Sequence, residues 1–228
     1  METEKLLHEI FNDATYIILE MLWNDKPWTI MCLYNPCFYG YYEKAESILN
    51  NIKNDKNALN QELILGLRGA CDGGHRSIVD LIIKVGKETN HKLDWNIGLW
   101  CACESGSLEI IDLMIDHGAR SINIGLHRSC QGGSMKAVRR MIKYGANEIN
   151  IGLDKACTYG NRDIAEYMLS LGADSVDFGL HNACCCCLGN YVEVIRLLIE
   201  HGADFELWKK IWYDDNNIKH REIAEAFK

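Results

Sequence analysis

The sequence contains little proline and no long apolar run. Only two prolines, Pro27 and Pro36, occur among 228 residues. Because proline removes a backbone donor and breaks helix interiors, nothing after Pro36 forbids helix on this ground. No stretch of about 18 apolar residues occurs, so no transmembrane helix is expected. The first residues lack the basic and apolar regions of a signal peptide, so we expect a cytoplasmic protein.

Basic charge is also scarce. The formal net charge is −8, and the basic pairs Arg139-Arg140 and Lys209-Lys210 stand alone. Proteins that bind nucleic acid use basic stripes to neutralise phosphates, and anionic membranes attract similar clusters. We therefore expect neither nucleic acid nor membrane among the partners.

The chain has 11 cysteines, an odd number. Without a secretory signal they are expected to be thiols rather than a disulfide framework. A run at Cys184–Cys187 lacks the second separated pair that a zinc site usually needs, so no metal and no cofactor is predicted.

A short string recurs along the chain: glycine, leucine, two variable residues, a small residue and cysteine. Its glycines are separated by 32, 27, 27 and 27 residues: Gly66, Gly98, Gly125, Gly152 and Gly179. Its cysteines, with an earlier degenerate copy, are predicted to be small buried side chains: Cys37, Cys71, Cys103, Cys130, Cys157 and Cys184. Internal repeats of this length indicate stacked units, each too small to bury its own faces.

Two further glycines punctuate each unit. One follows the string and is predicted to turn the chain between two helices: Gly74, Gly106, Gly133 and Gly160. The other is predicted to end the second helix: Gly86, Gly118, Gly145, Gly172 and Gly202. Between them lie apolar residues of helical period, so each unit is a helix pair and the fold class is all-α.

The spacing divides the chain into three parts. Residues 1–27 are predicted to be an N-terminal capping helix, and residues 205–228 a degenerate C-terminal capping repeat. Between them, residues 28–204 hold six repeats: 28–60, 61–93, 94–120, 121–147, 148–174 and 175–204. Polar-faced end units are what a stack of this kind requires.

These units resemble the ankyrin repeat family. Leu-His, Gly-His and Gly-Ala-Asp of its signature recur as Leu126-His127, Leu180-His181, Gly74-His75, Gly172-Ala173-Asp174 and Gly202-Ala203-Asp204. The resemblance implies an all-α ankyrin-repeat solenoid of stacked helix–turn–helix units. Thr-Pro is replaced by Ile-Gly or Phe-Gly, and spacings of 27 imply shortened β-hairpin fingers. One connection, from Lys87 to Asn96, keeps nearly full length.

Short repeats of this style are similar to the ankyrin arrays of large DNA viruses, which implies action in the host cytoplasm. The family usually binds proteins through its tips and the faces of its first helices. By position, the resemblance implies these partner-binding residues: Trp95, Asn96, Trp100, Glu104, Asn123, His127, Gln131, Asn150, Asp154, Thr158, Tyr159, Asp177, His181 and Cys185.

The resulting hypothesis is a monomeric, non-catalytic adaptor or decoy that captures a protein partner on its concave face. No phosphate-binding loop, dinucleotide fingerprint or zinc-protease motif occurs, and no catalytic residue is predicted. The alternatives are a metal or redox protein that uses its thiols, or a structural module that oligomerises. Fold alone does not identify the partner.

Overall fold

The computed structural model describes residues 33–185, 191–212 and 217–227, and within these ranges every regular element is a helix. The predicted capping helix at residues 1–27 lies outside them. The helices that open successive pairs, called the first helices below, are α2 (Tyr34–Phe38), α4 (Lys56–Asp72), α6 (Trp95–Ser105), α8 (Ile122–Gly132), α10 (Ile149–Thr158), α12 (Val176–Cys185) and α14 (Phe205–Trp212). The remaining helices are α3 (Tyr42–Ile52), α5 (Arg76–Glu88), α7 (Leu108–Asp116), α9 (Met135–Lys143), α11 (Arg162–Ser170), α13 (Tyr191–Glu200) and α15 (Ile218–Ala226).

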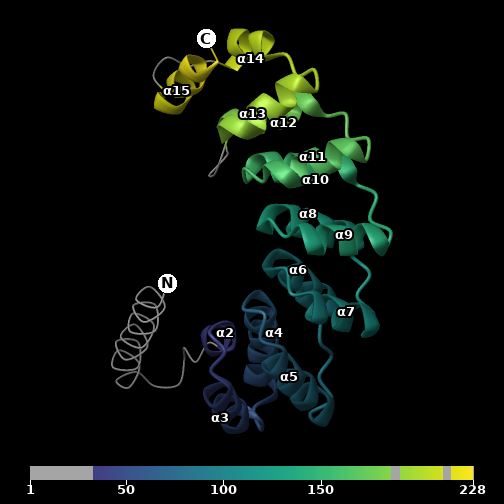
Figure 1. Cartoon of the computed structure of the whole chain (residues 1–228). Coiled ribbons are helices and arrows are strands. Elements are labelled where there is room, and N and C mark those ends of the chain that lie inside the picture. The colour runs from purple at the N-terminus through teal and green to yellow at the C-terminus, as the bar shows by residue number, and fades with distance from the viewer. Residues whose placement is uncertain (1–32, 186–190, 213–216, 228) are drawn as a thin grey trace, which may run out of the picture. The chain divides into compact units, whose positions relative to one another are not determined.

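Each first helix contacts both its own partner helix and the first helices beside it. In the middle of the chain α6 packs on α7, α8 on α9 and α10 on α11, while α6, α8, α10 and α12 follow one another in direct contact (Figure 1). At the C-terminal end, α14 and α15 both contact α12. The predicted stack of helix pairs is therefore confirmed.

Helix pairs form here because the two glycine positions reverse the chain twice per unit. Gly106 follows α6 with φ +77°, and Gly118 follows α7 with φ +104°. L-residues with a side chain rarely adopt positive φ, so glycine makes both reversals at low cost. The amide of Ala119 donates to the carbonyl of Met114 at 2.9 Å, which closes the end of α7.

One predicted helix end is wrong. Gly86 lies inside α5, which continues to Glu88, and the left-handed residue is Asn90 with φ +55°. The amide of His91 donates to the carbonyl of Gly86 at 2.8 Å, the same closing bond as at Gly118. Asparagine tolerates this conformation better than most residues, so it substitutes for the glycine four positions later. The connection before α6 is therefore short, and the prediction that it keeps nearly full length is also wrong.

The cysteine row forms the contact surface between neighbouring units. All six cysteines of the row are fully buried. A Cβ added to Gly125 would lie 3.1 Å from the Sγ of Cys103 in the preceding unit and 2.7 Å from the Sδ of Met141 in its own. Gly152 has the same neighbours one unit later, Cys130 and Met168. Glycine fits this position, where the ankyrin signature has proline, because a larger residue would have to displace the methionine thioether that lies against it.

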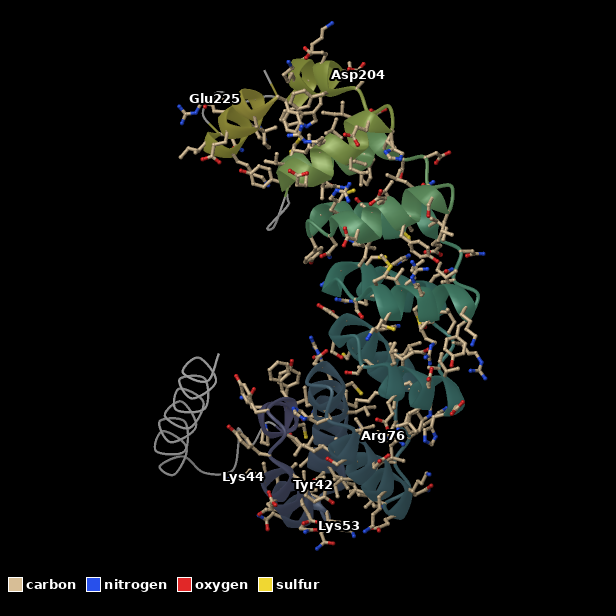
Figure 2. All side chains as sticks on the ribbon, in the orientation of Figure 1. Tyr42, Lys44, Lys53, Arg76, Asp204 and Glu225 are labelled. Atoms are coloured by element: carbon tan, nitrogen blue, oxygen red, sulfur yellow. The ribbon has the colours of Figure 1, made fainter. Side chains whose placement is uncertain are left out.

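The apolar residues of the second helices complete the core. Ile111 and Met114 of α7 are fully buried, as are Val138 and Met141 of α9. Burial of a side chain of this size contributes about 1.5–3 kcal/mol. Polar contacts on the outer surface join the same helices: Arg76 at the start of α5, labelled in Figure 2, reaches Glu109 of α7 at 3.0 Å.

Some of the predicted unit boundaries lie between helices, and one lies inside a helix. Those after residues 120, 147 and 174 lie in connections between helices. The one after residue 60 falls inside α4, which begins at Lys56 with Asp55 as its N-cap. The side chain of Asp55 accepts hydrogen bonds from the amides of Asn57 and Ala58, and this cap moves the start of α4 toward the N-terminus. The division into units remains a proposal.

Candidate functional site

A hollow on the first-helix face lies across α2, α4, α6 and α8. It has a volume of about 700 Å³, and we call it the Trp100 groove. Its walls include apolar, aromatic and charged side chains: Tyr34, Ile64, Arg68, Trp100, Glu104 and Arg128. Grooves with an apolar lining and a few polar groups are the usual form of a binding site.

Trp100 is the largest aromatic residue that lines this groove. Its Nε1 is buried and has no hydrogen-bond acceptor among the described residues. A buried donor without an acceptor costs about 1–3 kcal/mol. Tryptophan is also among the residues that most often dominate the energy of protein interfaces. The groove therefore contains an anchor residue of the type that partners contact.

The charged groups of the groove are paired across the helices. Arg128 of α8 lies 3.1 Å from Glu104 of α6, and the side-chain Nε2 of Gln131 donates to the same carboxylate at 2.8 Å. The hydroxyl of Tyr34 donates to Asp72 at 3.0 Å. Burial, together with the Asp72 carboxylate, raises the pKa of Tyr34 to about 12. Tyr34 therefore remains a hydrogen-bond donor at neutral pH.

Four of the predicted binding residues at the tips connect one unit to the next, and we call them the asparagine ladder: Asn96, Asn123, Asn150 and Asp177. The side-chain oxygen of Asn96 accepts hydrogen bonds from the amides of Arg120 and Ser121, at 2.8 and 3.0 Å. The other three repeat this at the following connections, Asp177 through a single bond to the amide of Asp204 at 2.8 Å. Contact of these residues with a partner remains a prediction. Because their accepting oxygens bond within the chain, a partner would contact their remaining side-chain atoms.

Most of the other predicted residues also contact their own chain. The ring of Trp95 stacks on His117 at 4.5 Å between centroids, and Thr158 donates to the carbonyl of Asp154 at 2.8 Å. Asp154 accepts a hydrogen bond from Asn182, and burial raises the pKa of its carboxyl. Tyr159 is exposed at the end of α10.

His127 links α8 to the residue before α10. Its Nε2 lies 3.0 Å from the Oε2 of Glu148. Burial lowers the pKa of His127, although the nearby Glu148 carboxylate opposes this shift. The neutral imidazole is therefore favoured in the folded chain.

Cys185 lies between two imidazoles at the end of α12. Its Sγ is 3.8 Å from the Nδ1 of His181 and 3.9 Å from the Nε2 of His220 on α15. Cys185 is exposed, whereas the other described cysteines are buried and burial raises the pKa of Cys103 and Cys130 to about 12. Thiols with a raised pKa react slowly, so Cys185 is the accessible thiol of this set.

Two pairs of predicted site residues come together in different places. Trp100 and Glu104 share the Trp100 groove, whereas His181 and Cys185 lie together on α12. Sequence reasoning missed Arg128 as a groove residue. The sequence did offer a signal: Arg128 directly follows His127, and His127 occupies the repeat position that Trp100 has one unit earlier.

A second missed feature is an apolar residue at the third position of five first helices, which is half-buried in α6 and exposed in the other four. We call this set the apolar column: Ile97, Ile124, Ile151, Phe178 and Leu207. The repeated string Ile-Asn-Ile-Gly-Leu at 122–126 and 149–153 was its signal.

Two other kinds of site are absent from the described residues. Among the residues with described positions, no group of three histidine, cysteine, aspartate or glutamate side chains could hold a metal ion. Over the same ranges, no helix has the length and apolar character needed to cross a membrane.

Family models for ankyrin repeats match this chain, three copies over residues 67–178 and one over residues 180–209. Together they cover more than half of its 228 residues, and the helix-pair stack agrees with them. The chain belongs to the ankyrin repeat family, whose domains are generally protein-binding modules and typically non-catalytic.

Among solved structures, the chain is similar to the ankyrin repeat domain of human ASB11, with a TM-score of 0.53 and 23% sequence identity. The match covers 76% of this chain and 85% of that one. At this identity the likeness shows the fold alone. No curated protein matches the sequence.

Proposed function

We propose that this chain is a non-catalytic adaptor or decoy that captures a protein partner on the face formed by its first helices, the concave face of ankyrin stacks, which includes the Trp100 groove. The carrying observation is the buried indole N–H of Trp100, which has no acceptor within the described residues and lines a groove of about 700 Å³. A partner that fills the groove would remove apolar surface from water, including that of the Trp100 ring. Rigid stacked units also limit the entropy that is lost on binding.

The test is affinity capture from cell extract with quantitative mass spectrometry, comparing groove variants with a matched control. Ile64 lines the groove and is 36% exposed, whereas Leu171, at the end of α11, is 39% exposed and lies outside it. Partners of the groove should be retained by the wild type and by Leu171→Glu, and lost with Ile64→Glu and Trp100→Ala. Equal retention by all four proteins would contradict the proposal.

A second candidate function rests on Cys185, whose thiol lies within 4 Å of two imidazoles. An imidazole can take the thiol proton and raise the fraction of nucleophilic thiolate. Thiol chemistry at this site predicts that the rate of Cys185 alkylation by iodoacetamide titrates below the ordinary thiol pKa of about 8.5. A midpoint at or above that value would exclude this function.

The short repeats also support the proposal that the chain originates from a large DNA virus and acts in the host cytoplasm. Detection of the protein in the cytoplasmic fraction of infected cells would test this origin.

A further inference from the structure

Four residues of the apolar column are exposed rather than buried in the stack. Ile124, Ile151, Phe178 and Leu207 are 40%, 42%, 59% and 47% exposed. Each is the third residue of its helix, so the column contributes one apolar side chain per unit. Contiguous exposed apolar surface commonly marks an interaction site.

The spacing of the column restricts what can cover it. Successive first helices are in contact, and packed helices lie about 8–10 Å apart. An α-helix advances about 10.5 Å in seven residues, and these residues return to the same face. A β-strand advances about 10 Å in three residues, but side chains three residues apart point to opposite faces of the strand. A polyproline helix advances about 9.3 Å in three residues and keeps its face.

Hydrogen bonding separates the two remaining conformations. A polyproline helix has no internal hydrogen bonds, so its backbone groups need partners wherever they are covered. Beside the column, the side-chain oxygens of Asn96, Asn123 and Asn150 already accept backbone amides of their own chain. On the other side, Glu104 is paired with Arg128, and Asp154 accepts from Asn182. An α-helix satisfies its own backbone and does not need these groups.

We propose that the apolar column binds an amphipathic α-helix of a partner protein, which lies across the first helices and presents an apolar residue at about every seventh position. This proposal rests on the proposed function, and it specifies that the bound segment of the partner is a helix. Because the column offers one apolar side chain per unit, the removal of apolar surface from water contributes to the affinity for such a helix.

The experiment selects peptides from two phage-displayed libraries on the full chain. One library has a helical frame of about 28 residues built from alanine, glutamate, lysine and glutamine, and the other has a polyproline frame. In both frames the positions on one face are randomised. We expect enrichment from the helical library, with apolar residues about seven positions apart. Affinity of the enriched clones should fall about tenfold or more in Ile124→Glu and in Ile151→Glu, but by less than about twofold in the control Ile218→Glu, at an exposed apolar residue that begins α15.

Circular dichroism melting checks that each variant is folded, and Ile151→Ala serves where a glutamate lowers the melting temperature. Enrichment from the polyproline library alone, no enrichment from either library, or clones that bind the variants as well as the wild type would overturn the inference. The two proposals fail separately. A protein that is captured by the wild type, lost with Trp100→Ala and retained by the column variants supports the proposed function and overturns the helix inference.

Discussion

Replacement of Asn96 by alanine should weaken the junction between the units that contain α6 and α8. The side-chain oxygen of Asn96 accepts from the amides of Arg120 and Ser121 at 2.8 and 3.0 Å, and alanine removes both bonds. A net contribution of about 0.5–1.5 kcal/mol per bond gives a loss of about 2 kcal/mol in the free energy of unfolding. For a domain of about 150–250 residues, this lowers the melting temperature by roughly 4–8 °C.

The matched control is Asn96→Asp, because the ladder already uses an aspartate at its fourth position, where Asp177 accepts the amide of Asp204 at 2.8 Å. Aspartate keeps the accepting oxygen, so this variant should unfold close to the wild type. Amide hydrogen exchange adds a local measurement, since a loss of about 1.4 kcal/mol corresponds to a tenfold change in an opening equilibrium. The amides of Arg120 and Ser121 should exchange at least about tenfold faster in Asn96→Ala alone. If alanine leaves both measurements unchanged, or if aspartate is as damaging as alanine, the ladder does not stabilise the stack.

Three further predictions concern packing, thiols and pH. Gly132→Ala should destabilise the fold by about 3 kcal/mol, and more than Gly152→Ala, because a Cβ at Gly132 meets the rigid backbone oxygen of Glu104 whereas at Gly152 it meets a flexible methionine; chemical denaturation checks the order. Cys185 should be alkylated by iodoacetamide before the buried cysteines of the row, and peptide mapping that finds the row modified first would contradict the burial argument. Folding lowers the pKa of His127 below its unfolded value. Its contribution to stability is therefore present above about pH 6.5 and is lost as the pH falls through the folded pKa. Between pH 7 and pH 5, His127→Gln should lose less unfolding free energy than the wild type.

The repeated units and their buried cysteine row could be predicted because periodic constraints act on every copy. A glycine beneath a thiol and a thioether must recur wherever units pack in the same way, so its spacing is visible in the sequence. The end of α5 could not be placed, because Gly86 has the expected spacing while Asn90 has the required conformation. Both residues tolerate the left-handed region, and tertiary packing selects between them.

The candidate site was less predictable than the fold. The face of α6 that contains Trp100 and Glu104 follows from helical spacing within one unit. The pairing of Arg128 with Glu104 depends on how two units rotate against each other, which a single sequence does not record. The approach of His220 to Cys185 joins α15 to α12 across 35 residues and outside the repeat, so no periodicity reveals it.

Because the sequence repeats every 27 residues in the middle of this chain, one unit there can take the place of another in the stack. Because Asn96 and Asn123 make the same bonds to the connections that follow them, and Cys103 and Cys130 lie against equivalent glycines, removal of residues 121–147 would join two surfaces that already match. Asn96 would then face the amides of Arg120 and Glu148 in place of Arg120 and Ser121. The length of the chain, and with it the reach of its first-helix face, can therefore change by whole units through duplication or loss of DNA without a new joint having to evolve.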